Sequence, residues 1–260
     1  MSKMLKKSLN ILIGFSILLI IWQILVVFGK YNEYFLPSPI KVFFGIIELI
    51  TDGSLFIHIR ISLFRFFVGY ILAIFAGITL GLLLGWLTKL WGVIDPIVQF
   101  IRPISPIAWF PFIVLWFGIG DLPAIVVIFI ASFFPILLST ISAVQKINPI
   151  YLKIAKNFGI KQPYVFSKII FPAAFPYIMI GLHLALGAAW IFLVAGEMVG
   201  AQSGLGFLII DSRNNLRTDL VLAGIIFIGV LGVILDKLIK ILENWILKNW
   251  GMEPSEKDVL

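Results

Sequence analysis

The sequence predicts an all-α, polytopic membrane protein with about six transmembrane helices. Hydrophobic residues fill 61% of the 260 positions and charged residues only 13%, whereas soluble domains carry about 25% charged residues. Several apolar runs are also long enough to cross a bilayer, which takes about 20 residues per helix. One membrane domain therefore fits the length, and a soluble domain or a disordered chain is excluded.

The composition also argues against several kinds of site. The chain has no cysteine, and its two histidines, His58 and His183, stand far apart and outside any metal-binding spacing. We therefore expect no metal, no cofactor and no catalytic residue. The Gly29-Lys30 pair lacks the upstream glycine and the following hydroxyl residue of a phosphate-binding loop. If ATP is used, another subunit must bind it.

Six apolar runs are candidate spans. The first follows lysines near the N-terminus, but it is too long for a signal peptide and no cleavage site follows it, so we interpret it as a retained span. The third contains four prolines, each of which removes a backbone donor. We expect that run to be irregular and packed inside protein. The runs are residues 9–28, 61–87, 93–117, 122–144, 173–199 and 220–247.

The predicted organisation has four parts. Between the first two runs, Ser38 can cap a short helix that starts at Pro39. This helix is amphipathic, and it either lies in the outer membrane interface or packs within the loop. The parts are an N-terminal tail with the first span (1–35), an outer loop with this helix (36–60), a core transmembrane domain (61–249) that includes a cytoplasmic loop (148–172), and a C-terminal tail (250–260).

The basic residues orient the chain. With a cytoplasmic N-terminus, most of the 20 lysines and arginines fall in inner segments, and Arg65 is counted among the few on the outer side. The positive-inside rule therefore predicts that both termini are cytoplasmic. The net charge of +7 is explained by this topology. We expect the bilayer as a partner and no nucleic acid.

The second run carries a stripe of glycines at four-residue intervals. Gly77, Gly81 and Gly85 lie on one helix face, where they let a neighbouring backbone approach closely. The stripe predicts a helix contact, either within the subunit or between two copies of the chain.

Charged residues inside spans cost about 2.5 to 3.5 kcal/mol on insertion scales and are candidates for function. Arg102 in the third run and Glu197 near the end of the fifth are the two that we single out. They either pair with each other or line a translocation path, in which Arg102 would favour an oxyanion. His183 faces an otherwise apolar run and is interpreted as a packing histidine.

The loop at 148–172 predicts a helical hairpin. Residues 151–158 form the first short helix, Gly159 ends it in a left-handed conformation, and a second helix runs over 163–170. Its lysines alternate with apolar side chains that water alone would not favour exposing. The hairpin therefore needs a docking partner or a pocket of its own.

This loop resembles the cytoplasmic signature of permease subunits of bacterial ABC importers. The signature reads Glu-Ala-Ala, three residues, Gly, nine residues, then Ile-x-Leu-Pro. Lys153 replaces its glutamate, Ile154 its first alanine and Phe171 its leucine. The exchange of glutamate for lysine reverses the charge that the family presents to its ATPase at this position, so complementarity there is not established. The residues at the signature spacings are Lys153, Ile154, Ala155, Gly159, Ile169, Ile170, Phe171 and Pro172.

Further runs within residues 36–249 look like the nitrate, sulfonate and taurine branch of that family. One of them contains Ser105 and Trp109, which join Arg102 and Glu197 as candidate residues of the translocation path. The runs are residues 102–111, 116–120, 196–198, 204–206 and 217–219.

The resemblance implies a type I importer permease in the bacterial inner membrane. It implies a homodimer, two ATP-binding subunits on the cytoplasmic side and an extracytoplasmic binding protein that selects the solute. The chain itself would be no enzyme. It would form the path for a small anion such as nitrate, a sulfonate or taurine by alternating access, with ATP hydrolysis in the partner subunit.

Two other transport functions stay open. Related permeases serve vitamin precursors, and a secondary transporter would work without an ATPase. The latter should carry ion-coupling carboxylates within spans and often an inverted repeat, and neither is present in convincing form. A membrane-embedded enzyme would need a constellation of histidines or paired carboxylates that the sequence lacks.

Overall fold

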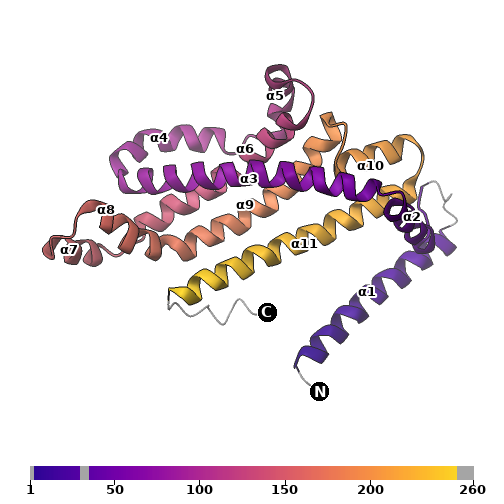
Figure 1. Ribbon diagram of the computed structural model, residues 1–260, viewed down its shortest axis with the longest axis horizontal. Helices are drawn as coiled ribbons and strands as arrows, with labels where there is room; N and C mark the ends of the chain where they lie inside the picture. Colours follow the sequence, from indigo (N-terminus) through magenta and orange to yellow (C-terminus); the bar gives the residue numbers. More distant parts are fainter. Residues whose placement is uncertain (1–2, 30–34, 251–260) are drawn as a thin grey trace. The chain divides into compact units, whose positions relative to one another are not determined.

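The computed structural model describes residues 3–29 and 35–250, and the regular elements in those residues are all helical (Figure 1). The predicted all-α class is confirmed. Contacts divide the chain into two units, one made of residues 1–61 and 203–229 and the other of residues 62–202 and 230–260. Residues 251–260, nearly all of the expected C-terminal tail, lie outside the described residues.

The first unit is built around a short helix that begins as the sequence predicts. The Ser38 hydroxyl accepts a hydrogen bond from the Lys41 backbone N–H at 3.3 Å, and Pro39 occupies the first turn. The Trp22 indole N–H donates to the Pro37 carbonyl at 3.1 Å and ties the preceding helix to this start. The helices of this unit are α1 (Lys3–Phe28), α2 (Pro39–Thr51), α10 (Leu205–Asn214) and the first parts of α3 (Ser54–Trp86) and α11 (Thr218–Asn249).

The α2 helix has one packed face and one exposed apolar face. Val42 and Leu49 are buried, and Gly45 lies so close to α11 that an added Cβ would stand 3.0 Å from Leu220. Packing within the chain therefore holds one side of this helix. A position of the other side in the outer membrane interface stays a prediction. The exposed apolar residues are Ile40, Phe43, Phe44, Ile47 and Ile50.

A tight turn joins α2 to α3. Gly53 adopts a positive φ of 77°, which glycine tolerates without steric cost. The Asp52 carboxylate accepts hydrogen bonds from the Ser54 hydroxyl at 2.7 Å and the Ser54 backbone N–H at 2.8 Å. These bonds lower the pKa of Asp52 and satisfy a donor at the start of α3.

The second unit has its core where α6 and α9 pack along each other. A close approach at Gly181 of α9, where an added Cβ would stand 2.5 Å from Ser139 of α6, belongs to this contact, and both helices carry buried apolar side chains such as Ile128 and Leu193. The elements of this unit are most of α3, α4 (Thr88–Ile101), η1 (Pro106–Trp109), α5 (Phe110–Phe117), α6 (Asp121–Gln145), α7 (Pro149–Asn157), α8 (Gln162–Val165), η2 (Phe166–Ile170), α9 (Phe171–Gly200) and the later part of α11.

The glycine stripe of α3 packs inside the subunit, against α6. An added Cβ would stand 2.8 Å from Ile136 at Gly77, 2.5 Å from Thr140 at Gly81 and 2.8 Å from Val144 at Gly85. Cβ atoms essentially never come that close, so the helices could not approach as they do with larger residues. Of the two contacts left open by the sequence, the structure has the one within the chain.

Four helices in the described residues are long and apolar enough to cross a membrane: α3, α6, the helix from Phe166 to Gly200, and α11. A fifth span is obtained if the bent pair Thr88–Ile101 and Pro106–Phe117 is taken together. The first predicted run falls in α1, where the apolar helix Leu12–Phe28 is shorter than the others. Five of the six expected runs thus each fall on one helix, and the third falls on the bent pair. Four or five of the six meet the length criterion.

The second helix of the hairpin does not stop at Ile170, as the sequence predicted. It begins as α8, widens into the π-helical turn η2 and continues directly into α9. The Phe171 N–H donates to the Phe166 carbonyl, five residues back, immediately before Pro172. A π-turn can absorb a residue that lacks an N–H, so the proline does not end the helix.

Candidate functional site

The hairpin predicted between α6 and α9 is formed by α7 and the start of the long second helix. The turn between them has Gly159 at a φ of 66°. The Ile160 N–H donates to the Ala155 carbonyl at 3.0 Å, which is the long hydrogen bond of a Schellman-type helix end. Nothing lies within 4 Å of a Cβ built on Gly159, so backbone conformation rather than space requires glycine there.

The hairpin exposes large apolar side chains. Tyr151 is 58% exposed, Phe158 80% and Tyr164 59%. Lys153 and Lys161 are exposed beside them. Such a surface combines hydrophobic area with positive charge, which is suited to a protein partner rather than to water alone.

Some residues at the signature spacings are exposed on the hairpin surface, and others are buried or half-buried beneath it. Lys153, Ile154 and Gly159 are exposed, whereas Ala155 is 1% exposed. Ile169 and Pro172 are half-buried at the base of the hairpin. There the ring of Phe166 contacts the ring of Trp86 at the end of α3, with centroids 5.1 Å apart.

Glu197 is bound to Arg65 and not to Arg102. One guanidinium nitrogen of Arg65 lies 2.8 Å from the Glu197 carboxylate, and the Ser62 hydroxyl donates to the same carboxylate at 2.8 Å. Arg65 Nε donates to the Asp121 carboxylate at 2.7 Å. The side chains of Arg65 and Glu197 are 1% and 0% exposed, while that of Asp121 is 54% exposed. This buried cluster joins α3, α6 and α9.

Arg65 was not expected at this site, because its place in the sequence put it among the outer basic residues. One signal was available: Ser62 and Arg65 lie three positions apart, and therefore on the same face of an apolar helix.

His183 also has polar partners, because its ring nitrogens lie 3.2 Å from Asp236 and 3.1 Å from Glu243. Within residues 3–29 and 35–250, no group of three or more histidines, cysteines, aspartates or glutamates is arranged to hold a metal ion.

The third predicted span breaks next to Arg102. The two helical segments on either side of residues 102–105 are bent by 82°, so the irregularity expected from the prolines is confirmed. The break borders a pocket of about 390 Å³ that Arg102 lines together with residues of α6 and α9. In the part of the chain that the structure describes, Arg102 has no ion-pair partner.

Two further candidate path residues flank this break without lining the pocket. Ser105 is exposed. Trp109 packs against the core formed by Phe110, Ile113 and Val127. The pocket is lined instead by side chains that the sequence did not indicate, among them Phe134, Ser139 and Phe192.

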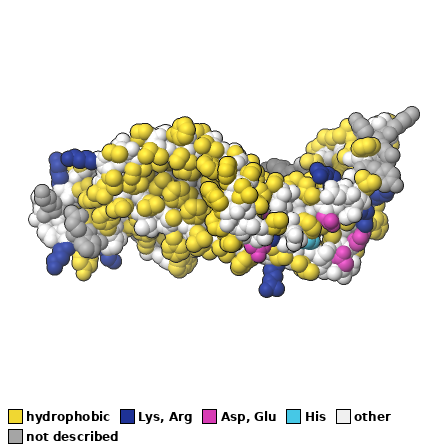
Figure 2. All heavy atoms as spheres, turned by 90° about the horizontal axis from the view of Figure 1, so that it is seen from above, with side chains coloured by type: hydrophobic (Ala, Val, Ile, Leu, Met, Phe, Trp, Pro, Cys, Tyr) yellow, Lys and Arg dark blue, Asp and Glu magenta, His cyan; other side chains and the backbone are white. Residues whose placement is uncertain are grey.

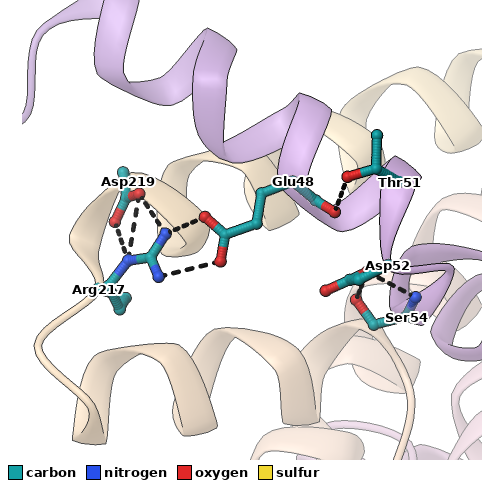
Figure 3. Close-up of polar contacts among 6 residues, drawn as sticks. All are labelled: Glu48, Thr51, Asp52, Ser54, Arg217 and Asp219. Carbon is teal, nitrogen blue, oxygen red and sulfur yellow. Dashed lines mark hydrogen bonds and ion pairs between the residues drawn. The ribbon is translucent and has the colours of Figure 1, made fainter.

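A second arginine cluster lies in the first unit (Figure 3). Arg217, in the link between α10 and α11, contacts the carboxylate of Glu48 on α2 at 2.6 Å and that of Asp219 at 2.9 Å. Its side chain is 41% exposed. Hydrogen bonds to Asp219 and then to Glu48 raise the pKa of Arg217, so it stays charged throughout the physiological range.

Hydrophobic side chains form a large continuous area on the face drawn in Figure 2. Leu115, Val93 and Phe100 are more than two-thirds exposed. Together with the long apolar helices, a broken span and a helical hairpin, these exposed apolar side chains define a multi-pass membrane protein.

Comparison with known proteins identifies the family. The family model described as "binding-protein-dependent transport system inner membrane component" matches residues 73–248. The chain belongs to this family of inner-membrane ABC permeases, in the branch of the nitrate, sulfonate and taurine permeases. It is a transport subunit.

Three relatives illustrate the match. The chain is 34% identical to the putative aliphatic sulfonates transport permease SsuC of Bacillus subtilis, over 90% of this chain and 84% of the relative. It is 31% identical to the taurine transport permease TauC of Escherichia coli, over 92% and 90%. It is 34% identical to the nitrate import permease NrtB of a Synechocystis species, over 90% and 88%.

The fold is that of a solved transporter. A chain of the methionine ABC transporter MetNI, in an inward-facing conformation, superimposes with a TM-score of 0.60 at 21% identity. The match covers 76% of this chain and 96% of the other. The predicted type I importer permease fold is confirmed.

Proposed function

We propose that this chain is the permease of an ATP-driven importer and forms the path for a small anionic solute by alternating access. It works as a homodimer with two cytoplasmic ATP-binding subunits and an extracytoplasmic binding protein. Both termini lie in the cytoplasm. ATP hydrolysis takes place in the partner, so this chain performs no covalent chemistry.

The hairpin is the single observation that carries the proposal. Phe158 and Tyr151 offer apolar area for burial, at about 25 cal/mol per Å², and Gly159 fixes the angle between the two helices. A docked ATPase that closes on ATP pushes on this hairpin. Because the second helix continues without a stop into α9, the push reaches a membrane span directly.

The solute class rests on a different observation. The relatives are named for aliphatic sulfonates, taurine, nitrate and bicarbonate, all of which carry an oxoanion group. Arg102 supplies a matching positive charge at the broken span, with Ser105 and Trp109 beside it. Glu197 is left out of the path, because its carboxylate is fully buried against Arg65.

The test is ATPase retention by Gly159→Val. A residue with a Cβ pays about 1 kcal/mol or more to hold the left-handed conformation, so the hairpin changes its angle and no longer fits its groove. The variant should insert in the membrane but lose the ATPase subunit on purification and not transport. Gly159→Asn should retain both, because asparagine tolerates that conformation.

Gly14→Val is the matched control. Nothing lies within 4 Å of a Cβ at Gly14 either, and its φ is ordinary, so ATPase retention should be normal. Normal retention by Gly159→Val in the same pull-down would show that the hairpin is not the docking element. A secondary transporter would retain transport in that variant, driven by an ion gradient.

Lys153 sharpens the docking prediction. If this position meets the ATPase, the partner presents an acidic or neutral surface there, and Lys153→Glu should weaken the complex at moderate salt. Unchanged retention would place Lys153 outside the contact.

A further inference from the structure

His183 of α9 lies between two carboxylates of α11. Its Nδ1 is 3.2 Å from a carboxylate oxygen of Asp236 and its Nε2 is 3.1 Å from one of Glu243. The two acidic residues are seven positions apart, and hence on one face of α11 and about 10 Å apart along its axis. These three side chains are named the histidine clasp. The clasp joins two long helices within the second unit.

The hydrogen bonds of the clasp depend on one proton. An ionised carboxylate only accepts hydrogen bonds, and a neutral imidazole has one N–H and one unprotonated nitrogen. A neutral His183 would therefore donate to one carboxylate, while its other nitrogen would face an oxygen with no hydrogen between them. An imidazolium donates from both nitrogens and satisfies both contacts. Imidazole is the more basic group, with an ordinary pKa of about 6.5 against about 4 for a carboxyl group, so the extra proton belongs on the ring.

The other ionisable groups around the clasp do not supply the missing hydrogen. The Tyr70 hydroxyl of α3 already donates to the Leu182 carbonyl at 2.7 Å. Residues 122–145 of α6 include no ionisable side chain. Lys237 and Lys240 lie between the two acidic residues in the α11 sequence, where they offset negative charge. Neither lysine places a hydrogen between the ring and a carboxylate oxygen.

The clasp lies where the apolar part of α11 ends. Residues 220–235 include no ionisable side chain, and Asp236 is the first after them. Its side chain is 57% exposed and that of His183 28%, which allows a proton to exchange. Beyond the clasp, the ring of Trp250 contacts that of Phe175 near the start of α9, with centroids 4.9 Å apart. The clasp thus fastens the end of α11 to the half of α9 that continues from the hairpin.

We propose that the histidine clasp is a proton-binding site, in which the imidazolium of His183 is held by ionised Asp236 and Glu243. While the proton is bound, α11 is tied to α9 by two charge-assisted hydrogen bonds. When the proton leaves to water, one of these bonds is replaced by repulsion between a nitrogen lone pair and a carboxylate. The tie is therefore present at neutral pH and is lost as the pH rises.

The direct test is nitrogen NMR of the full-length permease in lipid nanodiscs, with ¹⁵N-labelled histidine. The chain has two histidines, so the signals are assigned by the loss of one set in His183→Gln. At about pH 7.5, where an ordinary imidazole is about nine-tenths neutral, most His183 rings should be protonated on both nitrogens. His58 is the internal control. Its Nδ1 accepts a hydrogen bond from the Gly204 N–H at 3.1 Å, so its ring should be neutral.

Two variants of the same shape show whether the carboxylates hold the proton. Glu243→Gln places an amide donor opposite Nε2, so that a neutral ring can accept there and donate to Asp236. The protonated fraction of His183 should fall to about one-tenth at the same pH. Asp236→Asn should have the same effect through Nδ1. Asp211→Asn makes the same charge change at an exposed site on α10 and should leave His183 protonated.

Release of the tie can be followed at Leu247, one turn beyond Glu243. Leu247 is 8% exposed, and because the chain has no cysteine, Leu247→Cys provides a single thiol. Its rate of reaction with a maleimide is divided by the rate for the same thiol in the Glu243→Gln background, which removes the effect of pH on the thiol itself. This ratio should rise several-fold between about pH 6.5 and about pH 9.

Three results would overturn the inference. A neutral His183 ring at about pH 7.5 in the native permease would show that the clasp holds no extra proton. A ring that stays protonated in both amide variants would show that the two carboxylates do not hold it. A labelling ratio that does not change with pH would show that the proton does not fasten α11 to α9.

Discussion

Two arginines of this chain each bind two carboxylates, and they do so in opposite surroundings. Arg65 is 1% exposed and holds Glu197, which is fully buried, together with the half-exposed Asp121. Arg217 is 41% exposed and holds Glu48 and Asp219. Both clusters tie together segments far apart in the sequence, with comparable distances.

Burial decides what these similar geometries are worth. An exposed ion pair contributes about 0 to 1 kcal/mol, because water and salt screen it. Removing one partner of a buried pair costs about 3 to 5 kcal/mol, because the remaining charge has lost its compensation in an apolar surrounding. The Arg65 cluster should therefore be required for assembly of the helices, and the Arg217 cluster should adjust the position of α2.

The largest effect is expected for Arg65→Met. Glu197 then keeps the Ser62 hydroxyl but loses the guanidinium, at a cost of about 3 to 5 kcal/mol. The apparent melting temperature of the detergent-solubilised permease should fall by about 10 °C, as measured by loss of the monodisperse peak on heating. A fall of only 1 or 2 °C would mean that the cluster is solvated in the membrane protein.

A double variant should recover much of this loss. In Arg65→Met combined with Glu197→Leu no uncompensated charge stays buried, because Asp121 is half-exposed and can be hydrated. Replacing a buried pair by apolar residues is often close to neutral. The double variant should thus melt above the Arg65→Met single variant, and a lower melting temperature would contradict the argument from burial.

A smaller effect is expected for Arg217→Met. The variant should lose about 1 kcal/mol or less of its free energy of unfolding. This difference from the native protein should shrink as the salt concentration is raised from about 0.05 to about 0.5 M. A salt-independent loss of several kcal/mol would show that this cluster is buried in the assembled importer.

The smallest effect is expected for Asp52→Asn, because Asp52 is joined in Figure 3 to Ser54 and to no arginine. The Ser54 hydrogen bonds lower the pKa of Asp52, so its stabilisation is present above the ordinary value of 3.8 and is lost as pH falls through the lowered value. The variant should be less stable at pH 7 by no more than about 0.5 kcal/mol, and the difference should vanish in acid. A difference that persists below that range would exclude the charge as its cause.

Local patterns were enough to predict much of this molecule. Apolar runs gave the helices, four prolines gave the broken span, Gly159 gave the hairpin turn, and Ser38 with Pro39 gave the start of α2. Each of these features is set within a few residues of sequence. The signature spacing between Lys153 and Pro172 predicted the family. It could be recognised in the sequence because all its residues lie within one short hairpin.

Features that depend on distant partners could not be predicted in this way. Arg65 and Glu197 are 132 residues apart, and nothing in either local sequence selects the other over Arg102. The pocket is formed by three separate elements. The continuation of the hairpin helix into α9 was hidden by Pro172, which predicts a break unless the preceding turn widens.

Because the hairpin helix continues into α9, a small tilt at the hairpin moves the far part of α9 by a larger distance. The helix from Phe166 to Gly200 is unbroken, and Phe192 lies about 32 Å along α9 from its first residue. A rigid rod of that length converts a tilt of about 5° at the hairpin into a displacement of about 3 Å at Phe192. A displacement on this scale is as long as a hydrogen bond, so a small tilt of the hairpin, such as a docked partner would impose, would move this part of α9 relative to its neighbours.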